Sequence, residues 1–276
     1  MATNYDDLAC MTPTYVSFFL KDDNERINLP IGSMDRNMVF FAAHVVFFMF
    51  NFLNTLYIVL IEGYVLKGFK KNLLLQLTLG AAVFQMASCY SSVKRYNIND
   101  EYGYWGKFGT ITGLTAFAFV GSASIRMMAM CLLFPKNETF GKKVWIFASG
   151  AWALVSAGVF VYSMANWEEV YFEVFRQFVG LSNMMLIVSL GIMTVSLRGG
   201  NLVCVGMDND VLKRLYAVLF CFSVVAMGLA LKTEAPMFQF PSTGFNMSLL
   251  VIAAKYAGTM KITERGTAGE SQALNV

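Results

Sequence analysis

Long runs of apolar residues alternate with short polar segments along most of this chain. A run of about 20 apolar residues is long enough to cross the ~30 Å hydrocarbon layer of a membrane as a helix. Lipid cannot satisfy backbone polar groups, and no run alternates with the two-residue period of a barrel strand. The pattern therefore predicts an all-α bundle of seven transmembrane helices, at 39–61, 73–93, 108–134, 144–164, 174–197, 211–231 and 243–260.

Polar segments flank the seven runs and define the domain organisation. Residues 1–37 form a polar, exposed amino-terminal tail with six acidic residues, in which Pro13 and Pro30 predict no regular structure. Residues 38–261 form the seven-helix membrane domain, and residues 262–276 form a small, polar and flexible carboxyl-terminal tail. The acidic start is unlike a cleavable signal peptide.

Composition agrees with a multi-pass integral membrane protein. Of the 276 residues, 57% are hydrophobic and only 14% are charged, against about 25% charged in soluble domains. The net charge of +3 is scattered over the loops, which argues against a nucleic-acid surface. A single His and five Cys without a CxxC pair exclude most zinc and haem sites. We expect no metal site, no catalytic site and no enzyme.

The distribution of Lys and Arg over the loops predicts the orientation. With the amino terminus outside and the carboxyl terminus in the cytoplasm, the inner segments carry eleven Lys and Arg and the outer segments eight. Cytoplasmic loops carry the excess of these residues in membrane proteins. Asn137-Glu138-Thr139 is a glycosylation sequon that this orientation places in the cytoplasm, so sugar on Asn137 would contradict it.

Lys255 is an ionisable side chain within the last apolar run. At about 1.5 Å per residue it lies roughly 18 Å along a helix that starts near Thr243, close to the middle of the membrane. A charge at that depth costs several kcal/mol unless it is paired, neutralised or modified, so it is a functional-site hypothesis. The alternative is that the lysine stem snorkels to the headgroups, because the run ends only five residues later.

Polar residues share one face on several of the predicted helices. Asn51 and Asn54 lie roughly 18–22 Å into the first helix, level with Lys255, while Glu62 and Arg126 both fall near the inner interface, where they could pair. The midplane has no Asp or Glu, which argues against a carboxylate proton relay and favours anion binding. Hydrogen bonding between helices is the simpler use of such residues. The candidate ion path comprises Asn54, Thr112, Thr115, Glu62 and Arg126.

The motif Ala253-Ala254-Lys255, followed by Ala257 and Gly258, resembles the last helix of the microbial retinal-binding rhodopsins. In that family the lysine holds retinal as a Schiff base within seven helices. The resemblance implies retinal as a cofactor on Lys255, with Asn51 near the Schiff base. It also implies a chromophore pocket drawn from Trp152, Phe220 and Phe222.

The chain departs from that family at several positions. Val251 stands where a rhodopsin usually carries an acidic counter-ion, four residues before the lysine. The segment after Trp105, GKFGTITG, has neither the acid nor the proline usual in the third helix. Without a nearby carboxylate, such a protein would resemble the anion-conducting or signalling forms rather than the proton pumps.

Three functions follow as hypotheses. The first is a seven-helix photoreceptor or receptor-like protein with a retinal Schiff base at Lys255. The second is an anion-conducting channel or transporter without chromophore, whose conductance would follow the charge at position 255. The third is a structural membrane subunit without a ligand. The expected partners are the lipid bilayer, small anions and, in a homo-oligomer, further copies of the chain.

Overall fold

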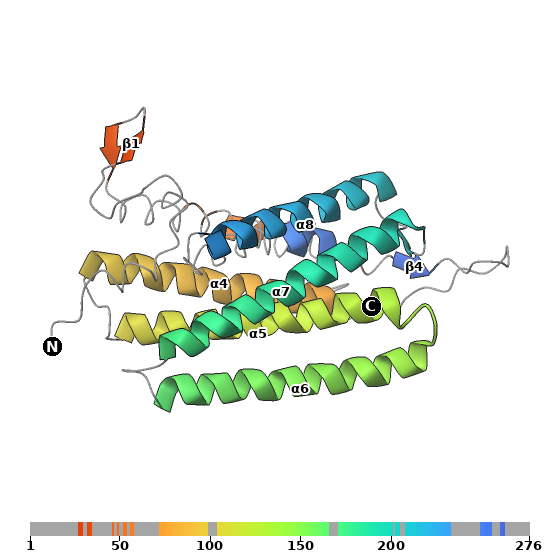
Figure 1. Ribbon diagram of the computed structural model, residues 1–276, viewed down its shortest axis with the longest axis horizontal. Helices are drawn as coiled ribbons and strands as arrows, with labels where there is room; N and C mark the ends of the chain where they lie inside the picture. The colour runs from red at the N-terminus through yellow and green to blue at the C-terminus, as the bar shows by residue number, and fades with distance from the viewer. Residues whose placement is uncertain are drawn as a thin grey trace.

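Five long helices lie lengthwise beside one another and make up most of the fold (Figure 1). The computed structural model describes residues 27–29, 32–34, 46, 49, 52–53, 56–57, 72–98, 104–165, 171–200, 202–204, 208–232, 249–255 and 260–262. The helices are α4 (Leu73–Ile98), α5 (Tyr104–Leu132), α6 (Glu138–Ala165), α7 (Tyr171–Arg198) and α8 (Asn209–Lys232). They match five of the predicted runs to within six residues at each end, which confirms the helical architecture.

Helix starts and stops follow from local side-chain chemistry. Before α4, Asn72 Oδ1 accepts the Leu75 N–H at 2.9 Å, and before α6, Asn137 Oδ1 accepts the Phe140 N–H at 2.9 Å. Each carboxamide satisfies one of the free amides in the first turn of its helix. Just after the carboxyl end of α7, Gly200 has a φ of +71°, a left-handed conformation that glycine adopts without a steric penalty.

Helix α5 lies at the centre of the described bundle. It packs against α4, α6 and α7, and α7 packs in turn against α8. Close approach of α4 and α5 uses small residues, since Ser88 Oγ donates to Gly109 O at 3.0 Å. The core contains large side chains from several helices, among them Phe117, Met127, Leu190 and Tyr216. The same core includes Leu250, Val251, Ala253 and Ala254 from the helical segment 249–255.

Within the part of the chain that the structure describes, four helices have spans long and apolar enough to cross a membrane, which is compatible with a membrane protein. These spans are Leu73–Ser91, Lys107–Leu132, Glu138–Ala165 and Gln177–Arg198. Successive long helices run in opposite directions, as the colour gradient of Figure 1 shows. The end of α5, the start of α6, the end of α7 and the start of α8 therefore lie at one end of the bundle, which we call the loop end.

Two short antiparallel strand pairs differ from the all-helical expectation. Strands β1 (Ile27–Leu29) and β2 (Gly32–Met34) pair within the tail where Pro13 and Pro30 predicted no regular structure. Strand β3 (Leu202–Cys204) pairs with β4 (Met260–Ile262), with Val203 opposite Lys261. The prediction that the last helix extends to Met260 is thus wrong at its end, because that residue belongs to a strand. The pairing holds the chain beyond the last helical segment against the α7–α8 connection.

Candidate functional site

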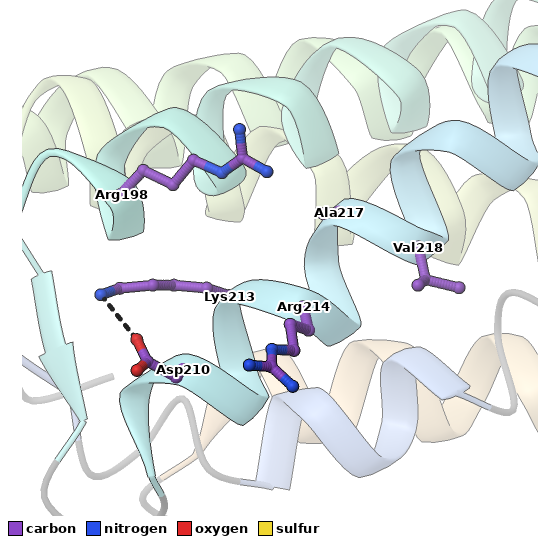
Figure 2. Close-up of a pocket in the computed structure, with 6 residues that line it drawn as sticks. All are labelled: Arg198, Asp210, Lys213, Arg214, Ala217 and Val218. Atoms are coloured by element: carbon purple, nitrogen blue, oxygen red, sulfur yellow. Dashed lines mark hydrogen bonds and ion pairs between the residues drawn. The ribbon is translucent and has the colours of Figure 1, made fainter.

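A pocket lined by basic side chains lies at the loop end, where α7 finishes and α8 begins (Figure 2). It has a volume of about 460 Å³. Arg198 comes from the last turn of α7, and the other charged residues come from the first turns of α8. The lining residues are Arg198, Asp210, Lys213, Arg214, Ala217 and Val218.

Local sequence explains why these charges gather here. Gly199 and Gly200 end α7, and Asp208 Oδ1 accepts the Asp210 N–H at 3.0 Å as α8 starts. The connection between the two helices is short, so the end of α7 stays beside the start of α8. The amino end of α8 also contributes the partial positive charge of the helix dipole. The carboxyl end of α7 contributes the opposite partial charge, so the positive sign of the pocket comes from its side chains.

The charges of the pocket do not cancel. Lys213 Nζ lies 3.2 Å from Asp210 Oδ1, a pair open to solvent and correspondingly weak. Neither Arg198 nor Arg214 forms an ion pair with any residue that the structure describes, and both are exposed. Three cations and one carboxylate leave an excess of two positive charges around the cavity. Guanidinium groups bind phosphate and carboxylate oxygens in a bidentate manner, so the arrangement is suited to an anion.

The structure places Lys255 near one end of α4 rather than near its middle. Asn72 Nδ2, directly before α4, donates to Ala254 O at 2.7 Å and lies 3.4 Å from Lys255 O. The membrane-length span of α4 begins at the next residue, Leu73. The backbone of Lys255 is therefore level with the end of that span, a position from which its stem can reach the headgroup layer.

Arg126 is buried with 4% of its surface exposed and lies between two aromatic rings. Its guanidinium carbon is 4.8 Å from the centre of the Phe134 ring and 4.6 Å from that of the Trp145 ring. Cation–π contacts of this kind stabilise a desolvated guanidinium. The predicted partner Glu62 lies outside the described residues, as do Asn51 and Asn54, so pairing with Arg126 stays a prediction.

The remaining predicted residues are engaged in helix packing. Thr112 Oγ1 donates to Phe108 O at 2.8 Å, and Thr115 Oγ1 donates to Ile111 O at 2.8 Å, both within α5. Hydroxyls satisfied by their own helix are poor candidates for lining an ion path.

The three aromatic candidates for the chromophore pocket lie on α6 and α8. Trp152 Nε1 donates to Ala118 O at 2.9 Å while its ring stacks on Phe178, 5.1 Å between centroids. Phe220 lies against Gly191 of α7, and Phe222 is half-buried on α8.

Sequence reasoning used Arg198, Lys213 and Arg214 only to orient the chain and missed their meeting in one pocket. A local signal for the site exists, because a helix-ending Gly199-Gly200 follows Arg198 and the capping sequence Asp208-Asn209-Asp210 precedes Lys213. Among the described residues, no group of three His, Cys, Asp or Glu could hold a metal ion. Comparison with protein-family models, curated proteins and solved structures finds nothing that matches this chain.

Proposed function

We propose that this chain is a seven-helix integral membrane protein that handles small anions as a channel or transporter without chromophore. The observation that carries the proposal is the excess of two positive charges in the α7–α8 pocket. A cationic vestibule at the end of membrane-length helices raises the local concentration of anions and repels cations. The absence of Asp and Glu from the predicted midplane supports the same sign of selectivity.

The seven-helix topology with the amino terminus outside belongs to this proposal. Five of its spans correspond to the five long helices, and the apolar runs 39–61 and 243–260 supply the other two. In that orientation the loop end, with Arg198, Lys213 and Arg214, faces the cytoplasm, as the excess of basic residues in inner loops favours. Glycosylation of Asn137, tested by a mobility shift after glycosidase treatment, would place the loop end outside and overturn the orientation.

Anion flux tests the proposed function. Protein reconstituted in vesicles of phosphatidylcholine alone should release chloride faster than empty vesicles and faster than it releases potassium. Arg198→Gln with Arg214→Gln should lower the anion rate about tenfold, because the vestibule loses its excess charge. Lys142→Gln with Lys143→Gln removes the same charge from the start of α6 at the same end of the bundle and should leave the rate nearly unchanged. Chloride release no faster than from empty vesicles would refute the channel or transporter.

Retinal at Lys255 stays a second hypothesis from the sequence. The position of Lys255 beside the end of α4 favours the snorkelling lysine over a buried Schiff base. An absorption spectrum after expression with all-trans retinal decides between them. A visible band in the parent that is missing from Lys255→Ala would establish the Schiff base, whereas two colourless proteins would exclude it. If chloride flux is also absent, the ligand-free structural subunit becomes the best remaining interpretation.

A further inference from the structure

The α7–α8 pocket has an apolar side as well as a charged one, and binding of a small anion would use only the charged side. Ala217 and Val218 line it beside the cations. Val218 is 56% exposed, and Val225, two helical turns further along the same side of α8, is 60% exposed. On α7, Val195 lies one turn before Arg198 and is 70% exposed. The pocket thus joins a cationic end to exposed valines on both of its helices.

Exposed apolar lines of this kind run along the length of both helices. They have a seven-residue spacing, which keeps side chains on one face of a helix over two turns. On α7 the line comprises Leu181, Val188 and Val195, and on α8 it comprises Val211, Val218 and Val225. On helices of membrane length such a surface contacts acyl chains. A ligand with an anionic head and apolar chains would therefore meet matching chemistry along its whole length.

We propose that the α7–α8 pocket binds the headgroup phosphate of an anionic phospholipid from the leaflet at the loop end. The arginines Arg198 and Arg214 would bind the phosphate, while the acyl chains lie against Val195, Val218 and Val225. This inference rests on the proposed anion binding at the same pocket and adds an anionic phospholipid as the occupant in membranes that contain one, whereas phosphatidylcholine vesicles leave the pocket open to small anions. A free phosphate would leave the valines unused, which is why we commit to the lipid.

Native mass spectrometry of the protein in neutral detergent tests this inference by titration with phosphatidylglycerol, phosphatidylcholine or inorganic phosphate. Phosphatidylglycerol should bind at least tenfold more tightly than phosphatidylcholine. Arg198→Gln with Arg214→Gln should weaken phosphatidylglycerol binding roughly 10- to 30-fold, at about tenfold for each 1.4 kcal/mol. Lys142→Gln with Lys143→Gln, which removes the same charge at the same end, should weaken it less than twofold.

A third variant separates a lipid from a free anion. Val218→Ser shortens the apolar wall without changing the charge, so it should weaken phosphatidylglycerol binding about threefold and leave phosphate binding unchanged. Equal losses in the two double variants would overturn the inference, since the lipid would then respond only to total charge. Equal affinity for phosphatidylglycerol and phosphatidylcholine in the parent would also overturn it. Chloride flux in phosphatidylcholine vesicles would then still stand as evidence for the proposed function, so the two failures are distinguishable.

Discussion

Helices α5 and α6 have nearly the same length and similar apolar content, yet the fold uses them in opposite ways. In the apolar 18-residue window of α5, 72% of the residues are buried by protein, whereas in that of α6 only 6% are. Phe147 and Leu154 of α6 are 79% and 76% exposed. Lipid and a protein core are equally apolar, so a membrane helix can face either one with the same composition. Apolar composition therefore does not decide which of the two helices is buried, and small residues alone do not either, since a Cβ added to Gly150 or Gly158 of α6 would meet nothing within 4 Å.

Trp152 is the strongest test of this comparison, because it is the largest of the three buried residues of α6, the others being Gly141 and Ser163. Trp152→Ala should lower the free energy of unfolding in detergent by about 3–5 kcal/mol, since the core loses a large ring and Ala118 O keeps Ser122 Oγ but loses the indole N–H as a donor. Phe147→Ala, on the exposed side of the same helix, should change it by less than about 0.5 kcal/mol. If Trp152→Ala and Phe147→Ala lowered the free energy of unfolding equally, a further partner would cover the exposed side of α6. Denaturant unfolding of the two variants, followed by far-ultraviolet circular dichroism of the backbone, measures both free energies.

Glycine positions sharpen the contrast between the two helices. A Cβ on Gly121 of α5 would collide with the Trp152 ring, which is fixed by its hydrogen bond and its stacking on Phe178. Gly121→Ala should therefore destabilise the protein by about 1–3 kcal/mol. Gly150→Ala on α6 meets nothing within 4 Å and should be neutral or stabilising by up to about 1 kcal/mol through helix propensity. A neutral Gly121→Ala would show that α5 and α6 are further apart than the structure has them. Thermal unfolding midpoints of the two variants give the answer.

The sequence predicted the helices well but not the contrast between α5 and α6, for a physical reason. Apolar runs set helix length, and Asn72 and Asn137 mark helix starts through local hydrogen bonds. In a soluble protein, amphipathicity would tell the buried face from the exposed one, but both faces of these helices are apolar. The position of Lys255 beside the start of α4 could not be predicted from its own run, since it depends on a contact with Asn72, 183 residues away in the sequence. The basic pocket needs residues from two helices, so no single run contains it.

Arg126 tests the contact between α5 and α6 at the loop end. Arg126→Lys keeps the charge but replaces a planar guanidinium that stacks on Phe134 and Trp145. We expect a loss of about 1–2 kcal/mol in the free energy of unfolding, because an ammonium is more strongly hydrated and stacks less well. Arg198→Lys, the same change at an exposed position, should cost less than about 0.5 kcal/mol. If Arg126→Lys proves equally harmless, the rings do not stabilise the guanidinium, and the pairing predicted with Glu62 becomes the better account of its burial.

The smallest effect is expected at the exposed start of α6. Glu138 Oε1 lies 2.6 Å from Lys142 Nζ, with 46% of the Lys142 side chain and 45% of the Glu138 side chain exposed, so water and salt screen the pair. Glu138→Gln also removes an acidic group from the first turn and should cost about 0.3–1 kcal/mol at low ionic strength. The cost should shrink in high salt, which thermal unfolding at two salt concentrations measures. Lys143→Gln provides the control and should show no such salt dependence. A loss that is larger and independent of salt would mean that α6 is fixed by polar contacts at its start, rather than by the packing of Trp152.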